Sequence, residues 1–249
     1  MRGELRRALE LIATGDMAGE RTEPSRFGLA VFDGRVPLRY DSNYLLVEEL
    51  PGSVSAEELA GEAGRVDRPM IMVRDQPTGA RLAPGFAALG WQLHRGLLMA
   101  HRRPPDRTAP TELVREVDEA TLRPARRGQL TGYPWATPAV VEQLLDAKLL
   151  IARAVRARFF AVVVGGQVVT YTDLYDDGRT AQIEDVATLA EHRGHGYASA
   201  VVLRALQEAR QSGCDLVFLA ADEDDWPKAL YRRLGFDELG RYVKFIRPT

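Results

Sequence analysis

Two closely spaced glycines at the start of a predicted helix form a candidate anion-binding site. The segment Arg193–Ala198 reads RGHGYA and lies between a predicted strand at Thr180–Leu189 and a predicted helix at Tyr197–Gln211. Glycine has no Cβ and readily adopts a left-handed backbone, so a ligand can approach its main chain closely. The first N–H groups of a helix have no internal partners, and the helix dipole favours an anion there. The segment therefore predicts a cradle for a phosphate or diphosphate.

Two familiar nucleotide-binding motifs do not fit this segment. The dinucleotide motif GxGxxG requires a third glycine, but Ser199 occupies that position. The Walker motif GxxxxGK[ST] does not occur in the chain. A glycine-rich turn that binds no ligand is the plain alternative.

The elements around this segment predict a mixed α/β fold in the C-terminal part of the chain. Strands and helices follow one another as β-α-β-β-β-α-β-α-β, and Gly165-Gly166 is typical of a hairpin turn between the second and third strands. In chain order the predicted elements are Thr111–Val117, Pro138–Arg158, Phe159–Val164, Gln167–Tyr175, Thr180–Leu189, Tyr197–Gln211, Leu216–Ala221, Pro227–Leu234 and Arg241–Ile246.

A proline-rich segment predicts a division of the chain. Pro104, Pro105 and Pro110 lie among charged residues, a composition that disfavours a helix or a central strand. We therefore expect an N-terminal α/β domain at residues 1–103, a linker at 104–110 and a C-terminal domain at 111–249. The N-terminal domain is expected to contain strands at Ser25–Phe32, Tyr44–Leu50, Met70–Arg74 and Trp91–His101, and helices at Ser55–Arg65 and Pro84–Leu89.

The composition describes a folded protein and disfavours several classes. The 249 residues are 45% hydrophobic and carry 33 Lys+Arg against 35 Asp+Glu, a net charge of −2. This near-neutral balance argues against a dedicated nucleic-acid binder. The first twenty residues lack the apolar core of a signal peptide, and the longest apolar run, at 159–164, is too short to span a membrane. We therefore expect a cytoplasmic protein that binds neither nucleic acid nor membrane.

Cysteine and histidine usage argues against a metal centre. Cys214 is the single cysteine, which excludes an internal disulfide and a cysteine-based cluster. His192 and His195 have no third ligand near them in the sequence, so no metal site is predicted. Arg123, Arg126 and Arg127 form a small basic patch that is either solvated or in contact with the phosphates of a cofactor or with an acidic substrate.

Two motifs in this order resemble the GCN5-related N-acetyltransferase (GNAT) family. Arg193-x-x-Gly196-x-Ala198 matches the family signature (Gln/Arg)-x-x-Gly-x-(Gly/Ala), and Ala229–Phe236 resembles the family ending LYxxLGF of the last helix. The predicted element order over 111–247 also fits. The resemblance implies a GNAT fold with a mixed sheet, preceded here by a smaller α/β domain. Phe86–Trp91 echoes Leu230–Phe236, which suits the degenerate GNAT-like first half found in two-domain members.

The resemblance implies acetyl-CoA as the acyl donor. It assigns the diphosphate to the backbone N–H groups of Arg193, Gly194, His195, Gly196, Tyr197, Ala198 and Ser199. The pantetheine arm would pair like a strand with Val186, Ala187 and Thr188, where the family's central strand separates from its neighbour at a bulge. A backbone donor near Val186 would stabilise the oxyanion.

Direct transfer to an amine requires an acid and a base. The resemblance assigns the acid role to Tyr231, whose alternative role is core packing. Glu184 is the candidate base; alternation directs it to one face with Val186 and Thr188 and Asp185 to the other, unless a bulge reverses the phase. Both carboxylates could instead be solvated strand charges.

We therefore predict an acetyl-CoA-dependent N-acetyltransferase acting on a primary amine of a small molecule or peptide. The alternative is a CoA-binding sensor or interaction module of the same fold. The sequence departs from the family in placing Asp224 where an Asn is frequent and Pro227 where an Ala is frequent. The predicted acceptor pocket contains the aromatic residues Tyr133, Trp135 and Tyr175. The N-terminal part is expected to close this pocket or to form a homodimer contact.

Overall fold

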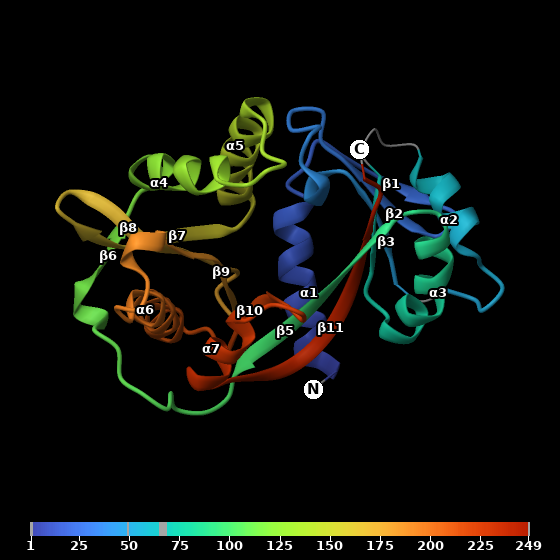
Figure 1. Ribbon diagram of the computed structural model, residues 1–249. Coiled ribbons are helices and arrows are strands. Elements are labelled where there is room, and N and C mark those ends of the chain that lie inside the picture. Colours follow the sequence, from blue (N-terminus) through green and yellow to red (C-terminus); the bar gives the residue numbers. More distant parts are fainter. Residues whose placement is uncertain (1, 49, 65–68, 249) are drawn as a thin grey trace.

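The computed structural model describes residues 2–48, 50–64 and 69–248, which form one eleven-stranded mixed sheet with helices on both faces (Figure 1). The elements are α1 (Arg2–Asp16), β1 (Arg21–Ser25), β2 (Gly28–Phe32), β3 (Tyr44–Val47), α2 (Ala56–Ala63), β4 (Met70–Val73), α3 (Gln76–Ala88), β5 (Gln92–His101), β6 (Val114–Val117), α4 (Glu119–Thr131), α5 (Pro138–Ala154), β7 (Arg156–Val164), β8 (Gln167–Asp176), β9 (Thr180–Thr188), α6 (Tyr197–Gln211), β10 (Leu216–Asp222), α7 (Pro227–Arg233) and β11 (Phe236–Ile246). Short 3₁₀ helices lie at Tyr40–Ser42, Thr111–Leu113 and Ala190–His192.

The two halves of the chain exchange their last strands. The sheet order is β1-β2-β3-β4-β11-β5-β10-β9-β8-β7-β6, so β5 of the N-terminal half pairs with β10, and β11 of the C-terminal half pairs with β4. The exchanged strands also pair with each other from Phe236↔His101 to Ile246↔Gln92, and they lie side by side at the centre of Figure 1. One sheet therefore continues through both predicted domains.

The halves repeat the same local topology. Strands β3 and β4 are parallel and joined through α2, and strands β9 and β10 are parallel and joined through α6. The next helix, α3 or α7, has Leu89 or Leu234 as its C-cap, and this residue is followed by Gly90 with φ 76° or Gly235 with φ 90°. These left-handed glycines end each helix and start the exchanged strand. The sequence echo therefore corresponds to a structural repeat.

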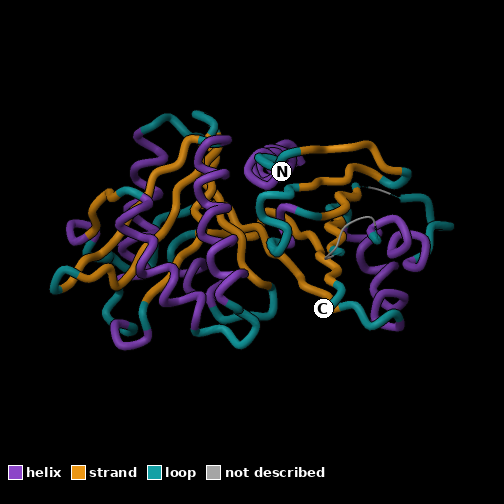
Figure 2. Tube along the Cα trace, turned by 90° about the horizontal axis from the view of Figure 1, so that it is seen from above, coloured by secondary structure: helices purple, strands orange, loops and turns teal. Residues whose placement is uncertain are grey.

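Helix α1 packs across the junction of the halves. Ala8 and Leu11 lie in one core cluster with Leu98 of β5, Phe218 of β10 and Leu239 of β11. Figure 2 shows this helix near the N-terminus, beside the central strands that connect the two halves. The opposite face of the same strands packs against α6 and α7.

Several predicted elements agree closely with the structure. The predicted helix Tyr197–Gln211 coincides with α6, and the predicted strands at Gln167–Tyr175, Thr180–Leu189 and Leu216–Ala221 match β8, β9 and β10 to within one residue. Arg102–Pro110 contains neither helix nor strand. The predicted elements Tyr44–Leu50 and Ser55–Arg65 each include residues outside the described part of the chain.

Other predicted boundaries are wrong. The helix predicted at Pro138–Arg158 ends at Ala154, because Arg156 pairs in register with Asp176 and their side chains form an ion pair. Helix α3 begins at Gln76 rather than at Pro84, and its N-terminus is capped by the Asp75 side chain. The stretch Ser25–Phe32 is divided between β1 and β2, and only the second half of Thr111–Val117 is a strand. Strand β11 begins at Phe236 rather than at Arg241.

Two helices, α1 and α4, were absent from the sequence prediction. Helix α1 is rich in charge, and its short apolar stripe is visible only against the strands that it covers. Helix α4 buries Leu122 and Arg126. Because one of its inward positions is an arginine, the usual apolar period of a helix is interrupted.

Candidate active site

The candidate active site forms where β9 and β10 separate. The parallel pairing of these strands runs from Thr180↔Leu216 to Ile183↔Leu219 and stops there, although β9 continues to Thr188. On its other edge, β9 contains a bulge, since the register with β8 shifts between Asp173↔Glu184 and Tyr171↔Ala187. The resemblance implied a bulge and a separation at this place, and the structure contains both.

The bulge reverses the alternation of side chains along β9. Ile183 and Val186 pack in the core on the α6 face, whereas Asp185 contacts Arg126 of α4 on the opposite face. Glu184 also faces this side and accepts a hydrogen bond of 2.6 Å from the Gln182 amide. The simple alternation that places Glu184 and Val186 on one face therefore does not hold, because the bulge reverses the phase of the strand between them, the exception that the prediction allowed.

A groove of about 1170 Å³ begins at this separation and extends to the start of α6. Gly194 and Gly196 have φ of 82° and 78°, and a Cβ at either position would meet nothing within 4 Å. Gly196 is the N-cap of α6, and no side chain caps this helix. The predicted cofactor residues that line the groove are Val186, Ala187, Thr188, Arg193, Gly194, Gly196, Tyr197, Ala198 and Ser199. An uncapped helix start beside open left-handed glycines suits a diphosphate.

His195 is the one predicted cofactor residue that does not line this groove. Its ring stacks on Tyr197 at 5.6 Å between centroids, and Nδ1 lies 2.9 Å from the carbonyl oxygen of Arg193. Asp224, which replaces a frequent family Asn, does not line the groove and lies 3.5 Å from Arg95. The neighbouring Trp226 is exposed and lines the groove instead.

Tyr231 lies in the wall of the same groove. Its side chain is buried at the C-terminal end of α7 and packs edge-on to Phe236. Burial raises the pKa of Tyr231 well above its usual value, and the carboxylates of Glu184 and Asp225 raise it further. The hydroxyl therefore keeps its proton at neutral pH, although the raised pKa makes it a weaker acid than an ordinary tyrosine.

A second pocket, of about 340 Å³, adjoins the groove at Gln129, Tyr133 and Val186. Its charged lining residues come from both halves of the chain: Arg39, Asp41, Arg126, Lys148, Glu184 and Asp185. Tyr133 and Trp135 line its opening and stack on each other at 5.1 Å between centroids. Tyr175, the third predicted pocket aromatic, does not line this pocket, because it is buried beneath the charged residues.

Glu184 lies in this second pocket and has the properties of a base that titrates near neutral pH. Burial is the largest effect, and together with the neighbouring Asp185 carboxylate it raises the pKa of Glu184 to about 7. Lys148 acts in the opposite direction by stabilising the ionised form. The pKa of Asp185 is instead lowered, because Lys148 and Arg126 outweigh its burial. Two adjacent carboxylates therefore differ in charge at neutral pH.

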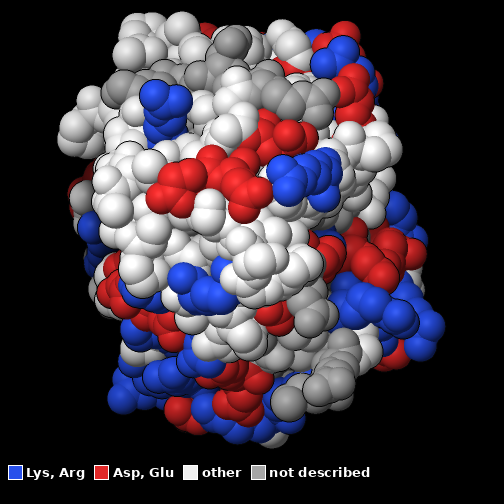
Figure 3. All heavy atoms as spheres, turned by 90° about the vertical axis from the view of Figure 1, so that its right-hand side faces the viewer, with Lys and Arg blue, Asp and Glu red and all other residues white. Residues whose placement is uncertain are grey.

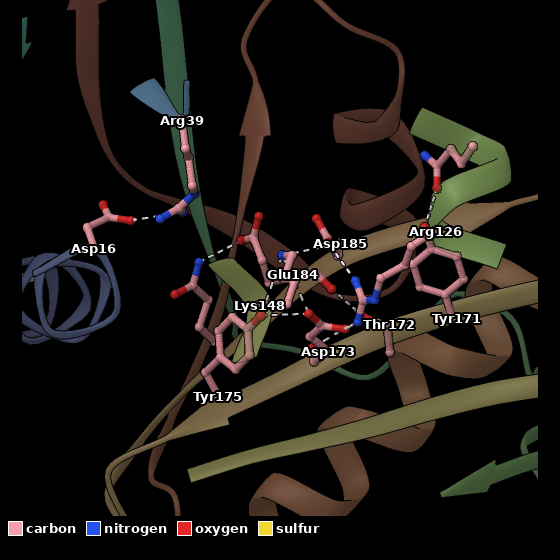
Figure 4. A network of polar contacts seen from close by, with 12 residues as sticks. Asp16, Arg39, Arg126, Lys148, Tyr171, Thr172, Asp173, Tyr175, Glu184 and Asp185 are labelled. Carbon is pink, nitrogen blue, oxygen red and sulfur yellow. Dashed lines mark hydrogen bonds and ion pairs between the residues drawn. The ribbon is translucent and has the colours of Figure 1, made fainter. Parts of the chain in front are cut away.

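A buried charged network lies beneath this pocket (Figure 4). Arg126 of α4 contacts both Asp173 of β8 and Asp185 of β9, and Lys148 of α5 contacts the same two carboxylates. The Tyr175 hydroxyl donates a 2.6 Å hydrogen bond to Asp173. Arg126 does not form the basic patch predicted with Arg123 and Arg127, because those two residues pair with Asp146 and Glu142 on the surface of α5.

The N-terminal counterpart of the diphosphate cradle is closed by its own side chains. Helix α2 carries a capping box in which Ser55 accepts from the N–H of Glu58 and the Glu58 carboxylate accepts from the N–H of Ser55. The first turn of α2 also contains Glu57, whereas that of α6 contains no acidic residue. The Arg81 guanidinium donates to carbonyl groups of the preceding loop. An anion is therefore disfavoured at this helix start.

Among the described residues, no group of three or more His, Cys, Asp and Glu side chains could hold a metal ion. In the same part of the chain, no helix has the length and apolar character needed to cross a membrane.

Comparison with known proteins identifies the family of the C-terminal half. Residues 117–236 match the model of the acetyltransferase (GNAT) family, so this part of the chain is a GNAT acetyltransferase domain. No protein of curated function matches the sequence at a significant level.

Solved structures extend the likeness in fold to the whole chain. A conserved protein of unknown function from Staphylococcus epidermidis is 16% identical, with a TM-score of 0.69 over 93% of this chain and 94% of its own. A GCN5-related N-acetyltransferase from Kribbella flavida is 19% identical, with a TM-score of 0.64 over 98% and 95%. A tandem GNAT protein from the clavulanic acid biosynthesis pathway is 15% identical, with a TM-score of 0.50 over 100% and 96%. The GNAT fold with an additional N-terminal half is therefore established.

Proposed function

We propose that the protein is an acetyl-CoA-dependent N-acetyltransferase that transfers an acetyl group directly to a primary amine. The observation that carries this proposal is the meeting, at Val186, of the groove that ends at the uncapped α6 helix with a second pocket that contains Glu184. One cavity suits the acyl donor, and the other suits the acceptor. The donor and acceptor can thus bind at the same time, which suits transfer without an acyl-enzyme.

The N–H groups of Arg193–Ser199 bind the diphosphate of acetyl-CoA in this proposal, and Val186–Thr188 lie along its pantetheine arm. Both segments line the groove, and the open space at Gly194 and Gly196 allows the phosphate oxygens to approach the main chain. The separated edge of β9 leaves room for the arm between this strand and β10. A backbone N–H near Val186 stabilises the oxyanion that forms during transfer.

Proton transfer is assigned to Glu184 and Tyr231. The amine nitrogen, in its neutral form, attacks the thioester carbon, and Glu184 accepts a proton from that nitrogen as the C–N bond forms, directly or through a water molecule. The C–N bond forms, the C–S bond breaks, and the thiolate takes a proton from the Tyr231 hydroxyl. Tyr231 lines the groove and Glu184 lines the second pocket, and these two cavities share Val186 in their linings. The products are the amide and free CoA.

Release of free thiol from acetyl-CoA over a panel of small-molecule and peptide amines tests this function. We expect turnover with at least one amine and its loss in Tyr231→Phe. Tyr44→Phe is the matched control, since the Tyr44 hydroxyl is buried without a hydrogen-bond partner in the N-terminal half. CoA binding without turnover on the whole panel would instead support a sensor or interaction module. Absence of CoA binding would refute both functions.

A further inference from the structure

Asp185 has an unusual backbone conformation at the centre of the site. Its φ of 55° makes it the one non-glycine residue in the described part of the chain with a positive φ. A side chain with a Cβ is disfavoured in this left-handed region, although Asp tolerates it better than most. Such a conformation persists only where the surroundings hold it, and it is frequent at functional sites.

Two cations hold the Asp185 side chain. Its Oδ2 atom lies 2.5 Å from Nη1 of Arg126 on α4 and 2.7 Å from Nζ of Lys148 on α5. Both cations also contact Asp173 of β8, whose side chain is completely buried. The Arg126 side chain is nearly as buried, with 2% of its surface exposed. The two cations and two carboxylates balance in charge, although the Nε atom of Arg126 is buried without a hydrogen-bond partner.

The position of Asp185 in β9 links this network to both ligands. Asp185 and Val186 together oppose Thr172 of β8, and the Thr172 hydroxyl donates a 2.8 Å hydrogen bond to the carbonyl oxygen of Glu184. Because of this extra residue, Glu184 faces the second pocket while Val186 packs on the opposite face. The pairing with β10 also ends two residues earlier, at Ile183.

We propose that Arg126 and Lys148 are positioning residues that act through Asp185. Their charges hold Asp185 in the left-handed conformation and so maintain the bulge that directs Glu184 to the amine and Val186–Thr188 to acetyl-CoA. This role rests on the proposed function. It also connects α4 and α5, the helices beside the acceptor pocket, to the strand that carries the candidate base.

A purely structural role would have a different signature. If the network served only to attach α4 and α5 to the sheet, the backbone preference of the residue at position 185 would not affect catalysis. Asp185→Gly and Asp185→Ala remove the same carboxylate, but only glycine adopts a left-handed φ without a steric penalty. The difference between these two variants therefore isolates the conformation of the bulge from the loss of charge.

The test measures kcat with the best amine of the panel, CoA affinity by calorimetry, and amide hydrogen exchange of the peptide that contains β9. We expect kcat to fall about tenfold in Asp185→Gly and about tenfold further in Asp185→Ala, the size of a left-handed backbone penalty. CoA affinity should change less than about threefold, because the α6 cradle is untouched. Exchange in β9 should rise in Asp185→Ala more than in Asp185→Gly.

Arg123→Met is the matched control, since Arg123 joins α4 to Asp146 of α5 at the surface, away from β9. It should leave kcat and exchange in β9 unchanged, whereas Arg126→Lys should retain more activity than Arg126→Met. Equal losses in Asp185→Gly and Asp185→Ala, or wild-type exchange in both, would overturn the proposal. If the wild type acetylated no amine, the proposed function would fail, while the exchange comparison would still decide whether the network holds the bulge.

Discussion

The strongest prediction concerns the pH dependence of Glu184. A base must be ionised to accept a proton, and burial together with Asp185 raises the pKa of Glu184 to about 7. The rate should therefore rise with pH through this value. A base with this pKa is about one-tenth ionised at pH 6 and about nine-tenths ionised at pH 8, so the ionisation of Glu184 alone should increase kcat/KM about tenfold between them.

The groups around Glu184 determine how this profile should move. Those that interact with it electrostatically are Asp185 on β9, Lys148 on α5, Asp173 on β8, Tyr231 on α7 and Tyr242 on β11. Asp185→Asn removes a like charge and should move the midpoint about one pH unit lower, whereas Lys148→Met removes an opposite charge and should move it about one unit higher. A general loss of stability cannot move the midpoint of the pH profile in opposite directions in these two variants.

The assay is kcat/KM against pH with one amine throughout, so that ionisation of the amine shifts every profile equally. Asp146→Asn is the control, because it removes a carboxylate from the exposed face of α5 and should leave the midpoint unchanged. Glu184→Gln should lower kcat/KM at least a hundredfold at pH 8, the contribution expected of a general base. If Glu184→Gln kept more than half of the activity, or if neither neighbour moved the midpoint, Glu184 would not be the base.

Three further predictions concern glycines and stoichiometry. Gly196→Ala should weaken CoA binding about tenfold by calorimetry because of its left-handed φ, whereas Gly165→Ala, in a hairpin with a similar φ, should leave binding unchanged; equal effects would contradict the cradle. Calorimetry should give one CoA per chain, and a second site would show that the closed α2 helix start still binds. Gly96→Ala places a Cβ 2.2 Å from the Tyr242 ring and should reduce the free energy of unfolding by about 1–3 kcal/mol, measured by thermal unfolding. The double variant with Tyr242→Ala should remove this clash. An unchanged Tm in the single variant would refute the contact.

The part of the site that could be predicted from the sequence depends on local signals. Gly196 and the stop at Gly213 define α6 within a few residues of its ends, and the cradle needs only backbone N–H groups at one helix start. The Leu-Gly-aromatic sequences after α3 and α7 likewise predict where these two helices end, because the signal lies at the helix end itself. These features can be predicted because the residues that determine them are neighbours in the sequence.

The charged network could not be predicted in this way. Arg126 is separated in the sequence from Asp173 by 47 residues and from Asp185 by 59. Alone, Arg126 is indistinguishable from Arg123 and Arg127, its surface neighbours on α4. The phase of β9 was uncertain for a related reason, because a bulge at a non-glycine residue depends on contacts from other elements. Only the assembled sheet brings these charges together.

The exchange of β5 and β11 makes the N-terminal half part of the structure around the site, although the start of its own helix α2 is closed by a capping box. Because β11 lies between β4 and β5, neither half completes its sheet alone. Lys244 of β11 forms an ion pair with Asp41, which together with Arg39 lines the second pocket. Under the proposed function, the N-terminal half therefore supplies one wall of the pocket that would hold the acceptor. Acceptor selectivity should then depend on residues of both halves, whereas binding of acetyl-CoA should depend on the C-terminal half.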